Sequence, residues 1–251
     1  EDLTIRYENN AETKQMCIYG LGEMHIDVIT SKLKNRFGTT VTVSPAKVPY
    51  RETIKKKVQV EGKHKKQSGG HGQYGHVKIE FSPGDTDGLE FTETIFGGSV
   101  PKNFHPAVEK GLQESMAKGV LAGYPVIGIK ANLFDGSYHD VDSSEMSFKL
   151  AANLAFKEGM KQGGAVLLEP VGELRVSIPT SYSGDIMGDM NKRRGRIIGM
   201  NQTDGMQQVE AEAPLAEMFK YATDLRSMTQ AKGSFKMSFE RYEEVPQAIA
   251  A

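Results

Sequence analysis

The sequence indicates the same order of elements twice, over residues 14–43 and 207–239. This order is a strand, a short turn, an amphipathic helix and a second strand. In the first copy, apolar residues spaced three, four and four positions apart predict one helix face: Ile26, Ile29, Leu33 and Phe37. The segment 39–43 is rich in β-forming residues and predicts the strand that follows this helix.

A further strand, helix and strand precede the second copy. Alternating apolar residues over 174–178 predict the first strand, Gly195 is predicted to end the short helix after it, and Ile197 and Ile198 predict the next strand. These six elements predict a complete βαββαβ, ferredoxin-like domain over residues 167–251. Because the first copy lacks the opening strand and helix, residues 1–46 are predicted to be the second half of such a domain, and we expect the chain to begin inside a domain.

The segment between these two units, residues 47–166, is set off by Pro45 and Pro49, which break the strand pattern. Alternating strand patterns flank a helix that Pro106 opens at its first turn. This order predicts a domain that contains a βαβ unit. The predicted fold class is therefore α+β, with several domains.

A second helix closes this middle domain. It follows a polar loop, and Asp142 with Glu145 three residues later matches a capping box at its start. Phe148 and Phe156 lie off the main apolar stripe, which predicts a well buried helix. The stripe itself is predicted from three residues four apart: Met146, Leu150 and Leu154.

Composition excludes several classes of protein. No apolar run approaches the roughly 18–20 residues that span a bilayer, and the first residues lack the features of a signal peptide. Cys17 is the only cysteine, so no internal disulfide forms, and we expect a cytoplasmic protein. Net charge is −1, yet residues 47–66 carry eight Lys and Arg against two Glu. Charge alone fits either a solvated strand face or a phosphate-binding patch.

A glycine-rich segment, Gly70–Gly75, matches the pattern G-x-G-x-x-G of dinucleotide sites. Such a site needs a helix directly after the pattern, whereas an alternating strand follows here. The segment is therefore predicted to be a hairpin loop whose glycines allow a partner to approach the backbone closely. No phosphate-binding G-x-x-x-x-G-K-[ST] motif occurs, and the spacing of His64, His71 and His76 is not that of a known metal site.

Several stretches together resemble elongation factor G, and their order agrees as well as their content. The resemblance covers nearly the whole chain. The stretches are Gly20–Asp27, Tyr50–Ile54, Gln67–His76, Asp135–Glu145, Ala155–Glu158, Leu167–Pro170, Gly184–Asp189, Arg193–Gly195 and Glu217–Ser227.

The resemblance implies a division into domains and a site. Residues 1–46 resemble the second half of that family's third domain, 47–166 its fourth domain, an arm that mimics tRNA and is built like a small-subunit ribosomal protein, and 167–251 its fifth domain. The arm tip implied to contact tRNA and mRNA consists of Ser68, Gly69, Gly70, His71, Gly72, Gln73, Ser137, Tyr138, His139 and Asp140. The implied RNA-phosphate patch consists of Lys63, Lys65 and Lys66.

The resemblance also implies partners. The arm would enter the small-subunit decoding centre of the ribosome, and the fifth domain would touch large-subunit RNA. GTP and Mg²⁺ would be bound by an N-terminal domain of the parent protein, so no catalytic site, cofactor or metal is expected in this chain, which we expect to be a monomer. His139 stands where the eukaryotic counterpart carries diphthamide. The motifs indicate a bacterial protein, in which this modification is not expected. His71 departs from the arginine that the family often has there.

Other functions remain open at this point. A paralogue that acts in ribosome recycling would share these motifs, and a tetracycline-protection protein is related, although the intact loop Ser68–Gly75 favours elongation factor G over the latter. A stand-alone RNA-binding or ribosome-assembly module, or an enzyme that borrowed the fold, is the alternative from a different class.

Overall fold

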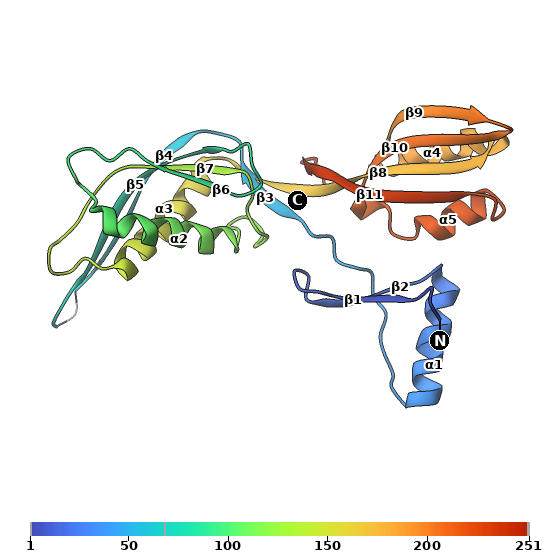
Figure 1. Ribbon diagram of the computed structural model, residues 1–251, viewed down its shortest axis with the longest axis horizontal. Coiled ribbons are helices and arrows are strands. Elements are labelled where there is room, and N and C mark those ends of the chain that lie inside the picture. The colour runs from blue at the N-terminus through green and yellow to red at the C-terminus, as the bar shows by residue number, and fades with distance from the viewer. Residues whose placement is uncertain (1, 68, 250–251) are drawn as a thin grey trace. The chain divides into compact units, whose positions relative to one another are not determined.

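The computed structural model describes residues 2–67 and 69–249, and the chain forms two compact units whose elements are labelled in Figure 1. One unit combines the residues up to Pro49 with Glu169–Glu243. The other combines Tyr50–Leu168 with the segment from Glu244 onward. Each unit contains both helices and β-sheet, which confirms the predicted α+β class.

The unit around Tyr50–Leu168 contains a four-stranded sheet in the order β4-β5-β7-β6. The β4–β5 and β5–β7 pairs are antiparallel, whereas β6 and β7 are parallel and are joined through α2, which is the predicted βαβ unit. A short strand, β3, pairs instead with the first residues of β8. The elements are β3 (Arg51–Ile54), β4 (Val58–Lys66), β5 (Gln73–Pro83), β6 (Leu89–Glu93), α2 (His105–Met116), β7 (Ile129–Ser137) and α3 (Glu145–Gln162).

Helix α3 packs against β4 and β5 through a face that the sequence pattern did not identify. Its buried side chains are mainly small or aromatic, whereas the predicted stripe is exposed, with Met146 at 57%, Leu150 at 37% and Leu154 at 43% of their full accessibility. The buried apolar residues are Phe148, Ala151, Ala152, Ala155, Phe156 and Met160. The assignment of the apolar face was therefore wrong, because close contact with the sheet selects alanine over leucine.

The start of α3 also differs from the prediction. Ser144 caps the helix by accepting a hydrogen bond from the backbone N–H of Ser147. Asp142, which was predicted to cap it, lies outside the helix and has a different partner, Gly72. Serine is an equally good N-cap residue, so the sequence offered two candidates and the wrong one was chosen.

The C-terminal strands and helices follow the order βαββαβ and form a sheet with the order β11-β8-β10-β9. This is the ferredoxin-like arrangement predicted for this part of the chain. Its core is formed by both helices and the strands, with Ile178, Met190 and Tyr221 among the fully buried side chains. The elements are β8 (Ala165–Pro179), α4 (Ser183–Lys192), β9 (Arg196–Thr203), β10 (Met206–Pro214), α5 (Tyr221–Met228) and β11 (Ser234–Glu244).

Helix α4 ends at Lys192, and the left-handed residue of the turn that follows it is Arg194, with φ 56°, rather than the predicted Gly195. The backbone N–H of Gly195 donates to Met190, and that of Arg194 donates to Asn191, as in a Schellman motif. The Arg194 side chain makes a two-fold contact with the buried carboxylate of Glu169. We infer that this ion pair offsets the cost of a left-handed residue that has a Cβ.

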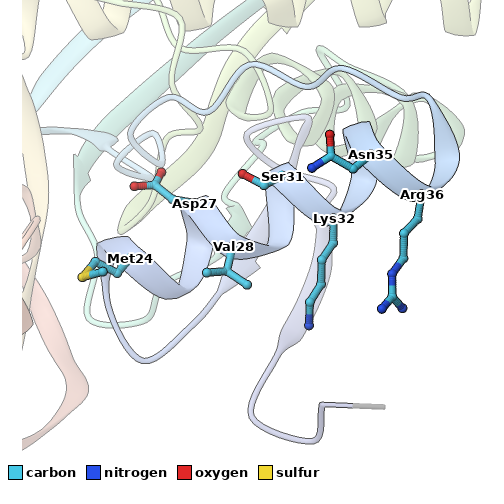
Figure 2. Close-up of a pocket in the computed structure, with 7 residues that line it drawn as sticks. All are labelled: Met24, Asp27, Val28, Ser31, Lys32, Asn35 and Arg36. Carbon is cyan, nitrogen blue, oxygen red and sulfur yellow. The ribbon is translucent and has the colours of Figure 1, made fainter.

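The N-terminal residues form an antiparallel hairpin of β1 (Arg6–Asn10) and β2 (Gln15–Tyr19), followed by α1 (Glu23–Phe37). Within the described residues, segment 39–43 forms no strand, so that prediction was wrong. β-Propensity reflects packing on a sheet, and this segment pairs with neither β1 nor β2. No residue of α1 is fully buried, and Phe37 is 73% exposed. One side of α1 lines a surface pocket, shown in Figure 2, with Met24, Asp27, Val28, Ser31, Lys32, Asn35 and Arg36.

Candidate nucleic-acid interface

The first loop predicted at the arm tip joins β4 to β5. The two strands pair in register up to Lys66 and Gln73, so Gln67 and residues 69–72 belong to the hairpin loop. Gly69 and Gly70 adopt positive φ angles of 38° and 153°, which glycine tolerates better than other residues. His71 is exposed, and the Gln73 side-chain oxygen lies 2.9 Å from His64 Nε2 on the neighbouring strand. Ser68, the remaining predicted residue, lies outside the described residues.

The second loop follows β7 and precedes α3. Its exposed residues include Tyr138 and Asp140, and the His139 side chain keeps 56% of its accessibility. The backbone N–H of His139 donates to Ser143 Oγ at 2.9 Å. The His139 ring nitrogen Nδ1 lies 3.3 Å from the backbone nitrogen of Val141 and 3.2 Å from that of Asp142. The loop is therefore held by its own hydrogen bonds while its aromatic side chains stay accessible.

Asp142 connects the two loops. Its Oδ1 accepts a hydrogen bond from the backbone N–H of Gly72 at 2.9 Å, and its carbonyl oxygen accepts one from the N–H of Tyr74 at 2.8 Å. Ser143 Oγ donates to the carbonyl oxygen of Tyr74 at 2.8 Å. A Cβ on Gly72 would lie 2.8 Å from Asp142 Oδ2, so a side chain there would press on the carboxylate. Two segments about seventy positions apart in sequence are thereby fixed side by side.

Ser137 differs from the other predicted tip residues because it is half-buried at the end of β7. Its Oγ lies 2.7 Å from Tyr74 Oη and 2.6 Å from His76 Nδ1. Burial lowers the pKa of His76 below its ordinary value of 6.5, despite Glu61 at 2.9 Å from Nε2. The neutral ring suits a hydrogen-bonded network with Ser137 and Tyr74, so we assign Ser137 to the support of the tip.

The predicted basic patch lies beside both loops. Lys63, Lys65 and Lys66 are exposed on β4, and Lys63 Nζ sits 5.8 Å from the centre of the Tyr74 ring. A small surface pocket opens between the loops and this strand. It is lined by Lys65, Lys66, Gln67, Gln73, Tyr74, His139 and Asp142. Ammonium groups, ring N–H groups and glycine backbone together suit the phosphate and ribose groups of a nucleic acid.

The sequence missed two contributors to this site. Asp142 was interpreted as a helix cap, and Tyr74 received no role, although the rings of Tyr74 and His139 lie 6.5 Å apart. No sequence signal identifies either contact, because each joins residues distant in the chain. Within residues 2–67 and 69–249, no group of three or more His, Cys, Asp or Glu is arranged to hold a metal ion. No helix in that part of the chain is long and apolar enough to cross a membrane.

Comparison with known families matches nearly the whole chain to consecutive parts of one protein family. Residues 1–45 match the model of elongation factor G domain III, 46–164 match domain IV, and 166–251 match the elongation factor G C-terminus. A crystal structure of a protein from Thermus thermophilus is similar, with a TM-score of 0.89 and 43% sequence identity. The match covers 98% of this chain but 37% of the Thermus chain. The chain belongs to the elongation factor G family.

Proposed function

We propose that this chain supplies the ribosome-contacting arm of a translation elongation factor G. Its two joined loops would enter the decoding centre and promote the GTP-dependent movement of tRNA and mRNA. The observation that carries this proposal is the convergence of two loops, exposed Tyr138 and His139 and three lysines at one end of a single domain.

The chemistry of this surface favours contact with paired RNA through shape and backbone. Gly69 and Gly70 are exposed and leave the backbone open to close approach, and Lys63, Lys65 and Lys66 suit phosphates. Recognition of shape suits a factor that must act on every codon. In this proposal the arm is domain IV, and the factor works as a monomer in the cytoplasm. GTP and Mg²⁺ bind the remainder of the full-length protein.

A translocation assay on the full-length protein tests this role. His139→Ala, or deletion of two residues from the loop 68–73, should slow mRNA movement at least tenfold while ribosome-stimulated GTP hydrolysis stays within about twofold. Asp87→Ala provides the control, because Asp87 is exposed in a different loop of the same domain. Equal translocation rates in wild type and both tip variants would overturn the assignment of the tip.

A recycling factor is the competing function, because the family match does not separate a translocase from a paralogue that splits ribosomes. The same proteins should be measured in a ribosome-splitting assay. Tip variants that slow splitting and leave translocation unchanged would replace our proposal with the recycling role. The 251-residue chain alone should show no heat of GTP binding in calorimetry, since it has no phosphate-binding motif of that type.

A further inference from the structure

We propose that Asp142 is a positioning residue that sets the tautomer of the His139 ring, so that the proton of the neutral ring lies on Nε2, where it can be donated to an acceptor oxygen of the bound RNA. This inference rests on the proposed function for its ligand. Its structural part, the tautomer and the connection between the loops, depends on the chain alone.

The tautomer follows from the partners of Nδ1. Two backbone N–H groups, those of Val141 and Asp142, lie 3.3 and 3.2 Å from this nitrogen, whereas the carboxylate oxygen Asp142 Oδ2 lies 3.6 Å away, beyond hydrogen-bond distance. Both groups are donors only, so Nδ1 must accept and therefore carries a lone pair rather than a proton. A neutral imidazole carries one proton on its two nitrogens, and this proton is then on Nε2.

The exposed nitrogen gives this tautomer a use. The His139 side chain is 56% exposed. Within the described residues, the hydrogen bonds of its ring are made by Nδ1 and not by Nε2. An Nε2–H donor suits a ribose hydroxyl, a base acceptor or a phosphate oxygen of RNA. Lys65 and Lys66, which line the same small pocket, supply positive charge beside it.

Asp142 sets this arrangement through three groups at once. Its N–H faces His139 Nδ1, its Oδ1 accepts from Gly72, and its carbonyl oxygen accepts from Tyr74. Moving Asp142 would therefore displace the glycine loop and the imidazole together. The Gly72 bond is charge-assisted, which makes it stronger than an ordinary backbone hydrogen bond.

Nitrogen NMR of the 15N-labelled chain in alkaline buffer tests the tautomer directly. His139, assigned by comparison with His139→Gln, should show Nδ1 in the unprotonated range and Nε2 in the protonated range. In Asp142→Ala, the Gly72 amide should exchange faster by about tenfold or more, and the His139 signals should move toward those of a free imidazole. Asp142→Asn keeps an acceptor oxygen, so its Gly72 exchange rate and its His139 signals should lie close to those of the wild type.

Asp87→Ala is the control, because Asp87 is an exposed acid in a different loop of the same domain. It should leave the Gly72 exchange rate and the His139 signals unchanged. A proton on Nδ1 in the wild type, or an Asp142→Ala variant with unaltered Gly72 exchange and His139 signals, would overturn the inference.

Translocation assays on the same variants separate this inference from the proposed function. In the full-length protein, Asp142→Ala should slow translocation as His139→Ala does, with Asp142→Asn close to wild type. If His139→Ala slows translocation and Asp142→Ala does not, the positioning role is wrong and the tip assignment stands. If neither variant slows it while the NMR results hold, the positioning of the ring stands and the role of the tip in translocation is wrong.

Discussion

Gly75 in β5 faces the backbone of Ser147 in α3 so closely that a Cβ on Gly75 would lie 2.3 Å from the Ser147 carbonyl oxygen. Gly62 in β4 has the same relation to Ala151, with a distance of 2.1 Å. No side chain fits at either position without moving the helix away from the sheet. The two glycines therefore set the spacing between α3 and the hairpin that carries the first loop.

Gly75→Ala should destabilise the arm domain by about 3 kcal/mol, because the atoms it would meet belong to the backbone and cannot rotate aside. Hydrogen exchange of the buried β5 amides, at Val77 and Ile79, measures this loss locally. Gly88→Ala is the control, since no atom lies within 4 Å of its Cβ position, and it should change stability by less than about 0.5 kcal/mol. Similar exchange rates in both variants would contradict the close approach.

The two faces of α3 should respond differently to substitution. Phe148 is fully buried and stacks on Phe104 with ring centres 4.6 Å apart, so Phe148→Ala should cost about 3–5 kcal/mol. Met146→Gln, on the exposed stripe, should cost less than about 0.5 kcal/mol. Urea unfolding, monitored through the loss of helix content, compares the free energies of unfolding of the two variants. A larger loss from Met146→Gln would restore the apolar face that the sequence pattern predicted.

Glu52 should prove essential for the segment that precedes β7. Its fully buried carboxylate accepts backbone hydrogen bonds from Leu121, Ala122 and Tyr124. Glu52→Gln places an NH₂ group against at least one of these donors and should cost about 1–3 kcal/mol. Asp87→Asn, which alters an exposed acid in the same domain, should have little effect on thermal unfolding. An equal melting temperature for both variants would show that the three bonds contribute no stability.

Acid should weaken the C-terminal domain through Glu212. Arg241, which contacts both carboxylate oxygens, and then Arg196 lower the pKa of Glu212 from 4.5 to about 2. Because the folded-state pKa is the lower one, the stabilisation is present above about pH 4.5 and is lost as the pH falls toward 2.

Glu212→Gln should therefore be less stable than wild type at neutral pH, and the difference should shrink between pH 4.5 and 2. Chemical unfolding at several pH values, monitored on amides of β10, measures this difference. Glu240→Gln, at an exposed position of β11, is the control. A difference between Glu212→Gln and wild type that stays constant over this range would rule out the ion pair as its cause.

Sequence patterns predicted the elements of this fold better than the contacts between them. Alternation identified β5 and β8, and Pro106 correctly marked the first turn of α2. The buried face of α3 was wrong because spacing alone cannot distinguish a leucine stripe from a face of alanine and phenylalanine. That choice depends on Gly62 and Gly75 in strands far away in the sequence.

The candidate site shows the same division. The structure exposes His71, Tyr138 and His139, which the resemblance implied to lie at the arm tip. Neither charge nor spacing could reveal that Asp142 bonds to Gly72, because local rules made it an acceptable helix cap. Only the resemblance to a family assigned both loops to one surface.

The hydrogen bonds that hold residues 138–143 and tie them to Gly72 and Tyr74 have a consequence for affinity. A loop that must become ordered on its target loses conformational entropy at that moment, and this loss weakens binding. Here much of the ordering is completed when the domain folds. In the proposed function, the tip would therefore engage and leave successive RNA targets with little reorganisation, which favours rapid, repeated contact over long-lived binding.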